Sequence, residues 1–235
     1  MTHSTNSIDF LQFEKQADLD FKNKDLLRQA FVHRSFLNEN KTSIAEHNER
    51  LEFLGDAVLE LIVTEYLFKK FPTKPEGELT AYRSALVNAN TLAGVAEGLQ
   101  VNDFLLLSKG ESKDKGRARQ VIMANTMESI IGAIFLDSGY AAAEKFVSAH
   151  VLILTDKIIE QGSFIDSKSL FQEKAQENTG ITPAYKTLKE EGPDHNKIFT
   201  VGVYLQTELV VEGVGKSKQE AEQDAAHKAL AVKGW

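Results

Sequence analysis

The sequence contains no cysteine, and this absence excludes several kinds of chemistry at once. Disulfide bonds, thiolate metal sites and cysteine nucleophiles cannot form, and a reducing compartment is compatible with the composition. The six histidines are scattered along the chain. They form no set at the ligand spacing of a zinc site, and no Ser-His-Asp arrangement can be argued from their positions.

Long apolar runs are also missing, because no stretch approaches the roughly 20 residues that a membrane span requires. The opening stretch MTHSTNSIDF has neither the basic region nor the apolar segment of a secretory signal. We therefore expect a cytoplasmic protein with no membrane partner. The net charge of −7 argues against nonspecific nucleic-acid binding as the sole function, although a local basic surface is compatible with it.

What the chain does contain is helical periodicity over its first two thirds. From Phe10 to Ile159, apolar residues recur at helical spacing and β-branched alternation is scarce. This predicts an all-α domain over residues 1–160, with residues 1–9 disordered. The Gly-punctuated, basic segment SKGESKDKGRARQ (108–120) predicts a loop, which either is simply solvated or faces phosphate groups.

The helical periodicity then ends, and residues 161–167 are expected to form a linker. Residues 168–235 predict a small α+β module in the order α-β-β-β-α, in which the segment 199–206 alternates apolar and polar residues as a half-buried strand does. Ser217 and Glu220 have the spacing of a capping box that opens a final helix. The packed side of that helix should consist of Ala221, Ala225, Ala229 and Leu230.

The stretch EHNERLEFLGDAVLEL (46–61) predicts an amphipathic helix with an unusual acidic flank. At about 100° per residue, one face gathers Leu51, Leu54, Val58, Leu61 and Ile62. The opposite face gathers Glu49, Glu52, Asp56 and Glu60. A solvated acidic surface is one interpretation, but like charges at these spacings repel and an aromatic ring, Phe53, lies beside them. A bound cation would explain the clustering.

A second acidic position strengthens the metal hypothesis. In VIMANTMESIIGAIFL the only ionisable residue is Glu128, and Asn125 lies three residues before it on the same face. A helix that is apolar nearly all round is buried, and a buried carboxylate needs a partner or a cation. An arginine or backbone donors would satisfy it equally well. Carboxylate and amide oxygens are, however, the ligands that Mg²⁺ accepts.

The stretch HNERLEFLGDAVLEL resembles the signature motif of the ribonuclease III family. The resemblance continues through HRSFLNEN, the FP…EGELT…RSALVN…TLA block and the NTMESIIGAIFLD helix, and the C-terminal module is similar to a double-stranded-RNA-binding domain. The resemblance implies that the catalytic residues are Asp56 and Glu128 and that the metal ligands are Glu52, Asp56, Asn125 and Glu128. Glu49 and Glu76 are implied as supporting acids. One position departs from the family, which usually has Asp where this chain has Asn125.

The activity that the resemblance implies is hydrolysis of phosphodiester bonds in double-stranded RNA, with Mg²⁺ as cofactor and Mn²⁺ as a possible substitute. The products would carry 5′-phosphate and 3′-hydroxyl ends, and the role would be rRNA and mRNA processing. The family works as a homodimer, and Phe53 matches the residue that packs into the partner subunit.

RNA contacts are expected from three segments of the C-terminal module. The polar stripe of the first helix suits the minor groove of A-form RNA. By resemblance, a loop enters the next minor groove, and the start of the last helix meets phosphates. The residues are Ser169, Gln172, Glu173 and Gln176 in the helix, His195 in the loop, and Lys216, Ser217 and Lys218 at the last helix. With nine Lys and no Arg against eleven Asp and Glu from residue 166 onward, binding should be weak and salt-dependent.

Two other functions fit parts of the sequence. A noncatalytic double-stranded-RNA-binding regulator could retain the nuclease domain as a dimer scaffold, and Asn125 is the feature that supports it. An acidic helical interaction protein is the third candidate, but it does not explain the C-terminal module.

Overall fold

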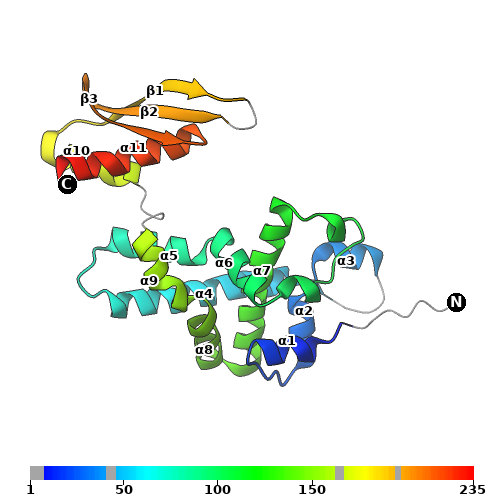
Figure 1. Cartoon of the computed structure of the whole chain (residues 1–235). Coiled ribbons are helices and arrows are strands. Elements are labelled where there is room, and N and C mark those ends of the chain that lie inside the picture. The colour runs from blue at the N-terminus through cyan, green and yellow to red at the C-terminus, as the bar shows by residue number, and fades with distance from the viewer. Residues whose placement is uncertain (1–7, 41–45, 162–166, 194–196) are drawn as a thin grey trace. The chain divides into compact units, whose positions relative to one another are not determined.

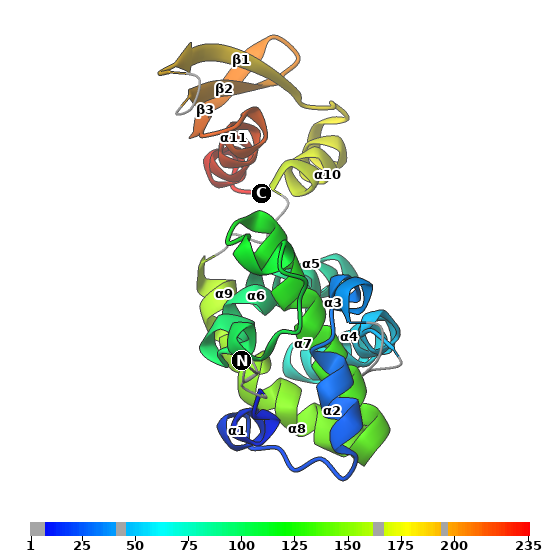
Figure 2. The same ribbon diagram turned by 90° about the vertical axis from the view of Figure 1, so that its right-hand side faces the viewer.

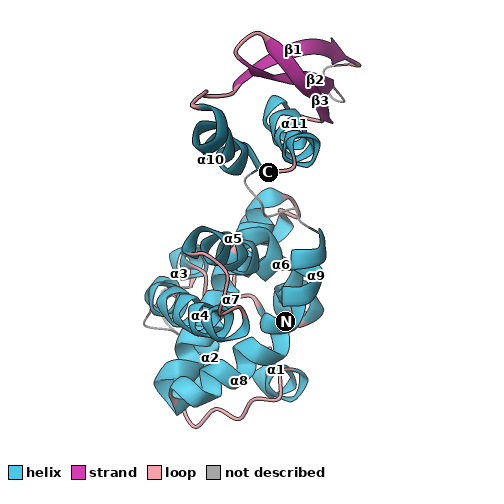
Figure 3. Cartoon of the chain, turned by 90° about the vertical axis from the view of Figure 1, so that its left-hand side faces the viewer, coloured by secondary structure: helices cyan, strands magenta, loops and turns pink. Residues whose placement is uncertain are grey.

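The computed structural model describes residues 8–40, 46–161, 167–193 and 197–235. The chain divides into two compact units, Met1–Phe164 and Ile165–Trp235. In the described residues the first unit contains helices and one isolated bridge, and all three strands lie in the second unit (Figure 3). The predicted fold class, an all-α domain followed by a small α+β domain, is confirmed.

The first unit is built from short helices around two long ones. Its α-helices are α1 (Phe10–Gln16), α2 (Lys24–Ala30), α3 (Arg34–Glu39), α4 (Glu49–Lys70), α5 (Glu76–Val87), α6 (Ala89–Gly98), α7 (Arg117–Ser138), α8 (Tyr140–His150) and α9 (Thr155–Gln161). Its 3₁₀ turns are η1 (Val101–Phe104), η2 (Glu111–Lys113) and η3 (Leu152–Leu154). Asp9 caps α1 through its side chain, whereas the sequence predicted disorder over residues 1–9; residues 1–7 lie outside the described part.

The two long helices, α4 and α7, cross at the centre of this unit (Figures 1 and 2). Glycines occupy the crossing from both sides. A Cβ added to Gly55 would overlap the backbone carbonyl of Glu128, and a Cβ added to Gly132 would overlap the carbonyl oxygen of Leu51. The backbones therefore touch where any side chain would separate them. This contact decides which residues of α4 face which residues of α7.

Helix α7 is mostly buried, as its composition predicted. It is also the only helix in the described ranges that is long and apolar enough to cross a membrane, but most of that window is buried, as core helices are. On α4 the predicted apolar face is only partly right. Leu51, Val58 and Ile62 are buried, whereas Leu61 is 56% exposed.

The basic segment after η1 ends earlier than predicted. Helix α7 begins at Arg117, so the loop runs only to Gly116. Arg119 is buried, and its side chain faces the loop instead of solvent or a phosphate group. Its guanidinium donates to the carbonyl oxygens of Asp114 and Glu111 and to the side chain of Asn102. Arg119 therefore holds the loop in shape from within the helix, and the sequence prediction for this residue was wrong.

The second unit has the predicted order α10 (Ser167–Thr179), β1 (Ala184–Glu191), β2 (Ile198–Leu205), β3 (Glu208–Gly215) and α11 (Lys218–Lys233). The strands form one antiparallel sheet in the order β1-β2-β3. Both helices cover the same face of that sheet (Figures 1 and 3). The linker predicted over 161–167 overlaps the last residue of α9 and the first residue of α10.

Small residues bring α11 close to the sheet. Its predicted packed side, Ala221, Ala225, Ala229 and Leu230, is buried. Gly213 on β3 leaves no room for a Cβ, because the backbone of α11 at Ala221 and Ala225 occupies that space. Ser217 caps α11 by accepting from the Glu220 N–H at 3.1 Å, and Glu220 accepts from the Lys216 N–H at 2.9 Å.

The alternation predicted for β2 holds on one face of the sheet and fails at one position on the other. Val201, Val203 and Leu205 are buried as predicted. Gly202 was placed on the exposed face but is buried. The reason is that the side chains of Leu209, Tyr204 and Leu188 close over it.

Candidate active site

The α4–α7 crossing places the four proposed metal-binding residues on facing helices. Asn125 donates from Nδ2 to Oε1 of Glu52 at 2.8 Å. Burial raises the pKa of Glu52, and the charges of Glu49 and Asp56 add to that effect, whereas the Asn125 amide opposes it by bonding to the carboxylate. The amide therefore occupies a place where a second carboxylate would repel Glu52.

Glu128 is the most perturbed carboxyl of this group. It is half-buried, and its pKa is raised to about 7 by burial first and then by the charges of Asp56, Glu52 and Glu60. Every one of these influences disfavours the ionised form. By contrast, the buried Glu14 accepts from Lys24 Nζ at 2.8 Å and from a backbone N–H. Within the described ranges no cation is paired with Glu128, and this is the arrangement that a positive ligand would relieve.

The remaining predicted acids lie at different distances from this centre. Glu49 is exposed, with Arg34 Nη1 3.7 Å from one carboxylate oxygen and His47 Nδ1 3.8 Å from the other. Glu76 opens α5 and accepts from Thr80 Oγ1 at 3.0 Å. None of the described contacts joins Glu76 to the other acids. Nor, in the described part of the chain, do three or more acidic or histidine side chains already converge as they would around one ion.

A cavity of about 290 Å³ opens beside Glu52 and Asn125. Its lining residues are His33, Arg34, Asn48, Glu49, Glu52, Val121, Ile122 and Asn125. Of the four proposed metal ligands, Glu52 and Asn125 line this cavity, whereas Asp56 and Glu128 do not. The cavity also shows that residues from three separate segments of the chain meet at this place.

Asn48 is a positioning residue that sequence reasoning missed. Its buried side chain donates to the Ala30 carbonyl oxygen at 3.1 Å, and its backbone N–H donates to the Val32 carbonyl oxygen at 2.9 Å. Its own carbonyl oxygen accepts from Ser129 Oγ on α7 at 3.3 Å. The start of α4 is thereby tied to both neighbouring segments. The only signal in the sequence was an Asn immediately before a helix start.

The perturbed carboxyl predicts a pH effect on stability in the absence of divalent ions. The pKa of Glu128 in the folded chain is about 7, against an ordinary 4.5, so the folded state holds this proton more tightly. The contribution of Glu128 to stability is therefore complete below pH 4.5 and is lost as pH rises through about 7. In EDTA, the unfolding free energy of the wild type relative to Glu128→Gln should fall between pH 5 and pH 8. A difference that does not change with pH would contradict the raised pKa.

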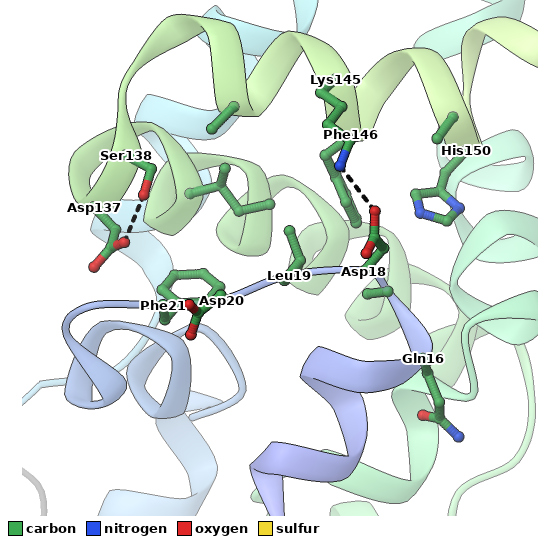
Figure 4. Close-up of a pocket in the computed structure, with 14 residues that line it drawn as sticks. Gln16, Asp18, Leu19, Asp20, Phe21, Asp137, Ser138, Lys145, Phe146 and His150 are labelled. Carbon is green, nitrogen blue, oxygen red and sulfur yellow. Dashed lines mark hydrogen bonds and ion pairs between the residues drawn. The ribbon is translucent and has the colours of Figure 1, made fainter.

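A second cavity, of about 480 Å³, lies away from these acids between the α1–α2 connection and helices α7 and α8 (Figure 4). Its charged groups are already engaged. Lys145 pairs with Asp18 at 2.8 Å, and Asp137 accepts from Ser138 and from the backbone N–H groups of Lys22 and Asn23. The acids of this cavity already have partners, whereas Glu128 at the helix crossing has no cation paired with it in the described ranges.

Comparison with known proteins identifies the family. A family model described as ribonuclease-III-like matches residues 23–155, and one described as a double-stranded RNA binding motif matches residues 167–233. The curated Ribonuclease 3 of Anoxybacillus flavithermus is 45% identical over 227 residues, which covers 95% of this chain and 94% of that protein. Ribonuclease 3 of Borreliella burgdorferi is 42% identical over 219 residues, covering 93% and 89%. The chain belongs to the ribonuclease III family.

The solved structures agree at the level of the fold. The nuclease domain of ribonuclease III from Campylobacter jejuni is 40% identical, with a TM-score of 0.56, and the match covers 61% of this chain and 96% of that one. As a member of the ribonuclease III family with curated relatives over nearly its full length, the chain is an endoribonuclease.

The residues predicted to contact RNA lie mostly at the surface of the second unit. Ser169, Gln172, Glu173 and Gln176 are all exposed on α10. Lys216 is exposed as well. Lys218 already has partners within the second unit, since its ammonium group pairs with Glu190 at 2.8 Å and lies over the ring of Phe199. His195 lies outside the described residues.

Phe53 belongs to an exposed apolar stripe along α4. Its side chain is 81% exposed, and Leu61 and Phe68 are 56% and 72% exposed. With Ala57 and Thr64 between them, these positions fall within about 80° of one helix face. Large apolar side chains aligned in this way mark an interaction surface. The stripe runs beside the acidic flank, which explains why an aromatic residue stands next to the carboxylates.

Proposed function

We propose that this ribonuclease III family member hydrolyses phosphodiester bonds in double-stranded RNA with the help of Mg²⁺, and that Mn²⁺ can substitute. The products would carry 5′-phosphate and 3′-hydroxyl ends. The observation that carries this proposal is Glu128, a half-buried carboxyl whose pKa is raised to about 7 by burial and three neighbouring acids. By family resemblance, the substrates would be rRNA and mRNA precursors in the cytoplasm.

The donor set supports a hard divalent cation. Glu52, Asp56 and Glu128 supply carboxylate oxygens and Asn125 an amide oxygen, and Mg²⁺ selects oxygen ligands of this kind. Glu52 already holds Asn125 in place through the 2.8 Å hydrogen bond from Nδ2. That bond leaves the amide oxygen available as a ligand. A bound ion would supply an activated water and a counter-charge for the leaving oxygen.

The protein groups have defined tasks in this reaction. Glu128 and Asp56 hold negative charge where a positive ligand is required, and Asn125 orients Glu52. The backbone contact at Gly55 and Gly132 fixes the distance between α4, which carries Glu52 and Asp56, and α7, which carries Asn125 and Glu128. The attacking water adds to phosphorus while the bond from phosphorus to the 3′-oxygen breaks. The phosphate stays on the 5′ end, and a proton completes the 3′-hydroxyl.

The test uses a labelled RNA duplex and the matching single strand, each incubated with Mg²⁺ or with EDTA. We expect cleavage of the duplex in Mg²⁺ only. New 5′ ends should accept a phosphate from polynucleotide kinase only after phosphatase treatment. Binding of the duplex without any cleavage would instead support the noncatalytic regulator, which Asn125 favours because it removes one charge from the site.

Asn125→Asp should reduce the Mg²⁺ concentration that gives half-maximal cleavage by roughly tenfold, about 1.4 kcal/mol. The new carboxylate would stand where the amide now donates to Glu52 at 2.8 Å, so it would repel Glu52 without metal and attract a divalent ion more strongly. The measurement is the initial rate on one duplex across a Mg²⁺ titration. An unchanged or higher Mg²⁺ requirement would exclude Asn125 from the metal site.

We also propose that the chain forms a homodimer through the apolar stripe Phe53–Leu61–Phe68 on α4. The Campylobacter jejuni structure is described as having a region involved in dimer formation in its nuclease domain, and the exposed stripe here supports the same behaviour. In light scattering, Phe53→Glu should weaken the dimer at least about tenfold, because a buried interface charge without a partner is strongly unfavourable. Ile153, 72% exposed outside the stripe, is the matched control. Equal dimerisation of Phe53→Glu and Ile153→Glu would refute the proposed interface.

A further inference from the structure

His33 lies on the wall of the cavity beside Glu52 and Asn125, and although it opens the HRSFLNEN stretch, the sequence assigned it no role. It stands between α2 and α3 and lines the same cavity as Glu49, Glu52 and Asn125. Its backbone N–H donates to the Leu106 carbonyl oxygen at 3.1 Å, and Val32 pairs with Leu106 in an isolated bridge. The backbone of His33 is therefore fixed relative to the chain that follows η1.

The imidazole ring is fixed as well. Its Nδ1 accepts from the Ser35 N–H at 3.3 Å and lies 2.8 Å from Ser35 Oγ. Ser35 Oγ in turn accepts from the Ser108 N–H at 3.1 Å. Because Nδ1 accepts from a backbone N–H, it carries no proton of its own, and the Ser35 hydroxyl is then the donor in the 2.8 Å contact. A neutral ring that accepts at Nδ1 carries its proton on Nε2.

The environment favours this neutral form. Burial lowers the pKa of His33, and the nearby charge of Arg34 lowers it further against the opposing effects of Glu111 and Glu49. Within the described part of the chain, no acceptor is bonded to Nε2. The ring thus carries one oriented N–H donor on a residue that lines the cavity, together with the polar side chains Arg34, Asn48, Glu49, Glu52 and Asn125.

We propose that His33 is a substrate-facing residue whose Nε2–H donates a hydrogen bond to an oxygen of the RNA backbone beside the carboxylate site. The acceptor is either a 2′-hydroxyl or a nonbridging phosphate oxygen. A neutral donor suits this place because it binds a backbone oxygen without neutralising the acids that hold the cation. The cation that lines this cavity, Arg34, already lies 3.7 Å from Glu49, and a lysine at position 33 would pair with Glu49 or Glu52 in the same way. The assignment rests on the proposed function.

The test begins with His33→Asn, which keeps a capping side chain at the start of α3 but is too short to place a donor where Nε2 lies. Cleavage of a defined duplex should fall about tenfold, the effect of one lost hydrogen bond. The melting temperature should stay close to that of the wild type. His33→Ala, which also lacks the cap, serves as the second variant, and its extra loss should appear in stability rather than in cleavage.

The decisive experiment measures whether the effect of the His33→Asn substitution depends on single-group changes in the RNA. Duplexes carrying one 2′-deoxy or one methylphosphonate substitution near the cleavage site are compared with the unmodified duplex. One substitution should slow the wild type about tenfold and leave His33→Asn unaffected. Coupling to a 2′-deoxy position assigns a 2′-hydroxyl, and coupling to a methylphosphonate assigns a phosphate oxygen. A slow variant that couples to neither, or a variant as active as the wild type, overturns the proposal.

The same comparison of variant and modified duplexes is also made by measuring equilibrium binding affinities in Ca²⁺. Failure of the wild type to cleave any duplex in Mg²⁺ would refute the proposed function by itself. The binding data would then still decide whether His33 contacts the RNA, because coupling in affinity does not depend on cleavage.

Discussion

Gly55→Ala should lower the free energy of unfolding by about 3 kcal/mol or more and abolish cleavage. The added methyl group would overlap the backbone carbonyl of Glu128. A helix backbone cannot move aside as a flexible side chain does, so α4 and α7 would have to separate. Overpacking a core typically costs 1–3 kcal/mol, and the rigid obstacle here places Gly55 at or beyond the upper end. Denaturant unfolding followed by circular dichroism measures the effect.

Gly94→Ala is the matched control for this substitution. Gly94 also lies inside a helix, α6, but beyond the backbone of its own helix no atom lies within 4 Å of the position that its Cβ would take. Alanine there should leave cleavage unchanged and stabilise the chain by up to about 1 kcal/mol, since glycine is a poor helix former. If the Gly55 and Gly94 variants were equally stable and active, the close crossing of α4 and α7 would not be what builds the site.

Glu128→Gln should reduce cleavage by at least about 10³-fold while leaving the fold and RNA binding nearly intact. Glutamine has almost the same volume, and at neutral pH the glutamate without metal is already half protonated, with a pKa of about 7. What is lost is the charge that holds the cation. Removing even a neutral stabilising donor from an active site costs 10²–10³ in rate, and a lost ligand charge should cost more.

Single-turnover cleavage and duplex binding in Ca²⁺ separate these two expectations. The control is Glu144→Gln, which removes an exposed carboxylate on α8 and should change neither quantity. Normal turnover by Glu128→Gln would remove this residue from the metal site. Loss of binding along with cleavage would show instead that the substitution disturbs the surface that receives RNA.

Periodicity in the sequence was sufficient to predict the features that repeat along a single helix or strand. The acidic flank of α4 and the packed alanines of α11 follow from spacing alone, because a single helix fixes their relative directions. The alternation of β2 also follows from spacing, except at Gly202, where neighbouring side chains cover the strand. The predicted burial of Leu61 was wrong for a related reason. Its direction was predicted correctly to within one helix face, but nothing in the described chain covers that edge of α4.

Features that join distant segments could not be predicted in this way. Asn48 and His33 act through backbone groups far along the chain, and a hydrogen bond to a carbonyl leaves no pattern in the sequence. Arg119 looked like one of several loop cations, yet its contacts with two loop carbonyls and with Asn102 of η1 bury it. Spacing placed Asn125 and Glu128 on one face, but joining them to Glu52 and Asp56 in one site came from family resemblance. Their alignment with Glu52 depends on a glycine contact whose partner, Gly132, had no evident role in the sequence.

The central claim is that the crossing of α4 and α7 builds a divalent-cation site from Glu52, Asp56, Asn125 and Glu128. Mn²⁺ binding to the metal-free protein, followed by the electron paramagnetic resonance signal of free Mn²⁺, tests it most directly. The wild type should take up Mn²⁺ at a saturable site on each chain, and Glu128→Gln should lose that site while Glu144→Gln keeps it. Equal Mn²⁺ uptake by the wild type and Glu128→Gln would contradict the account.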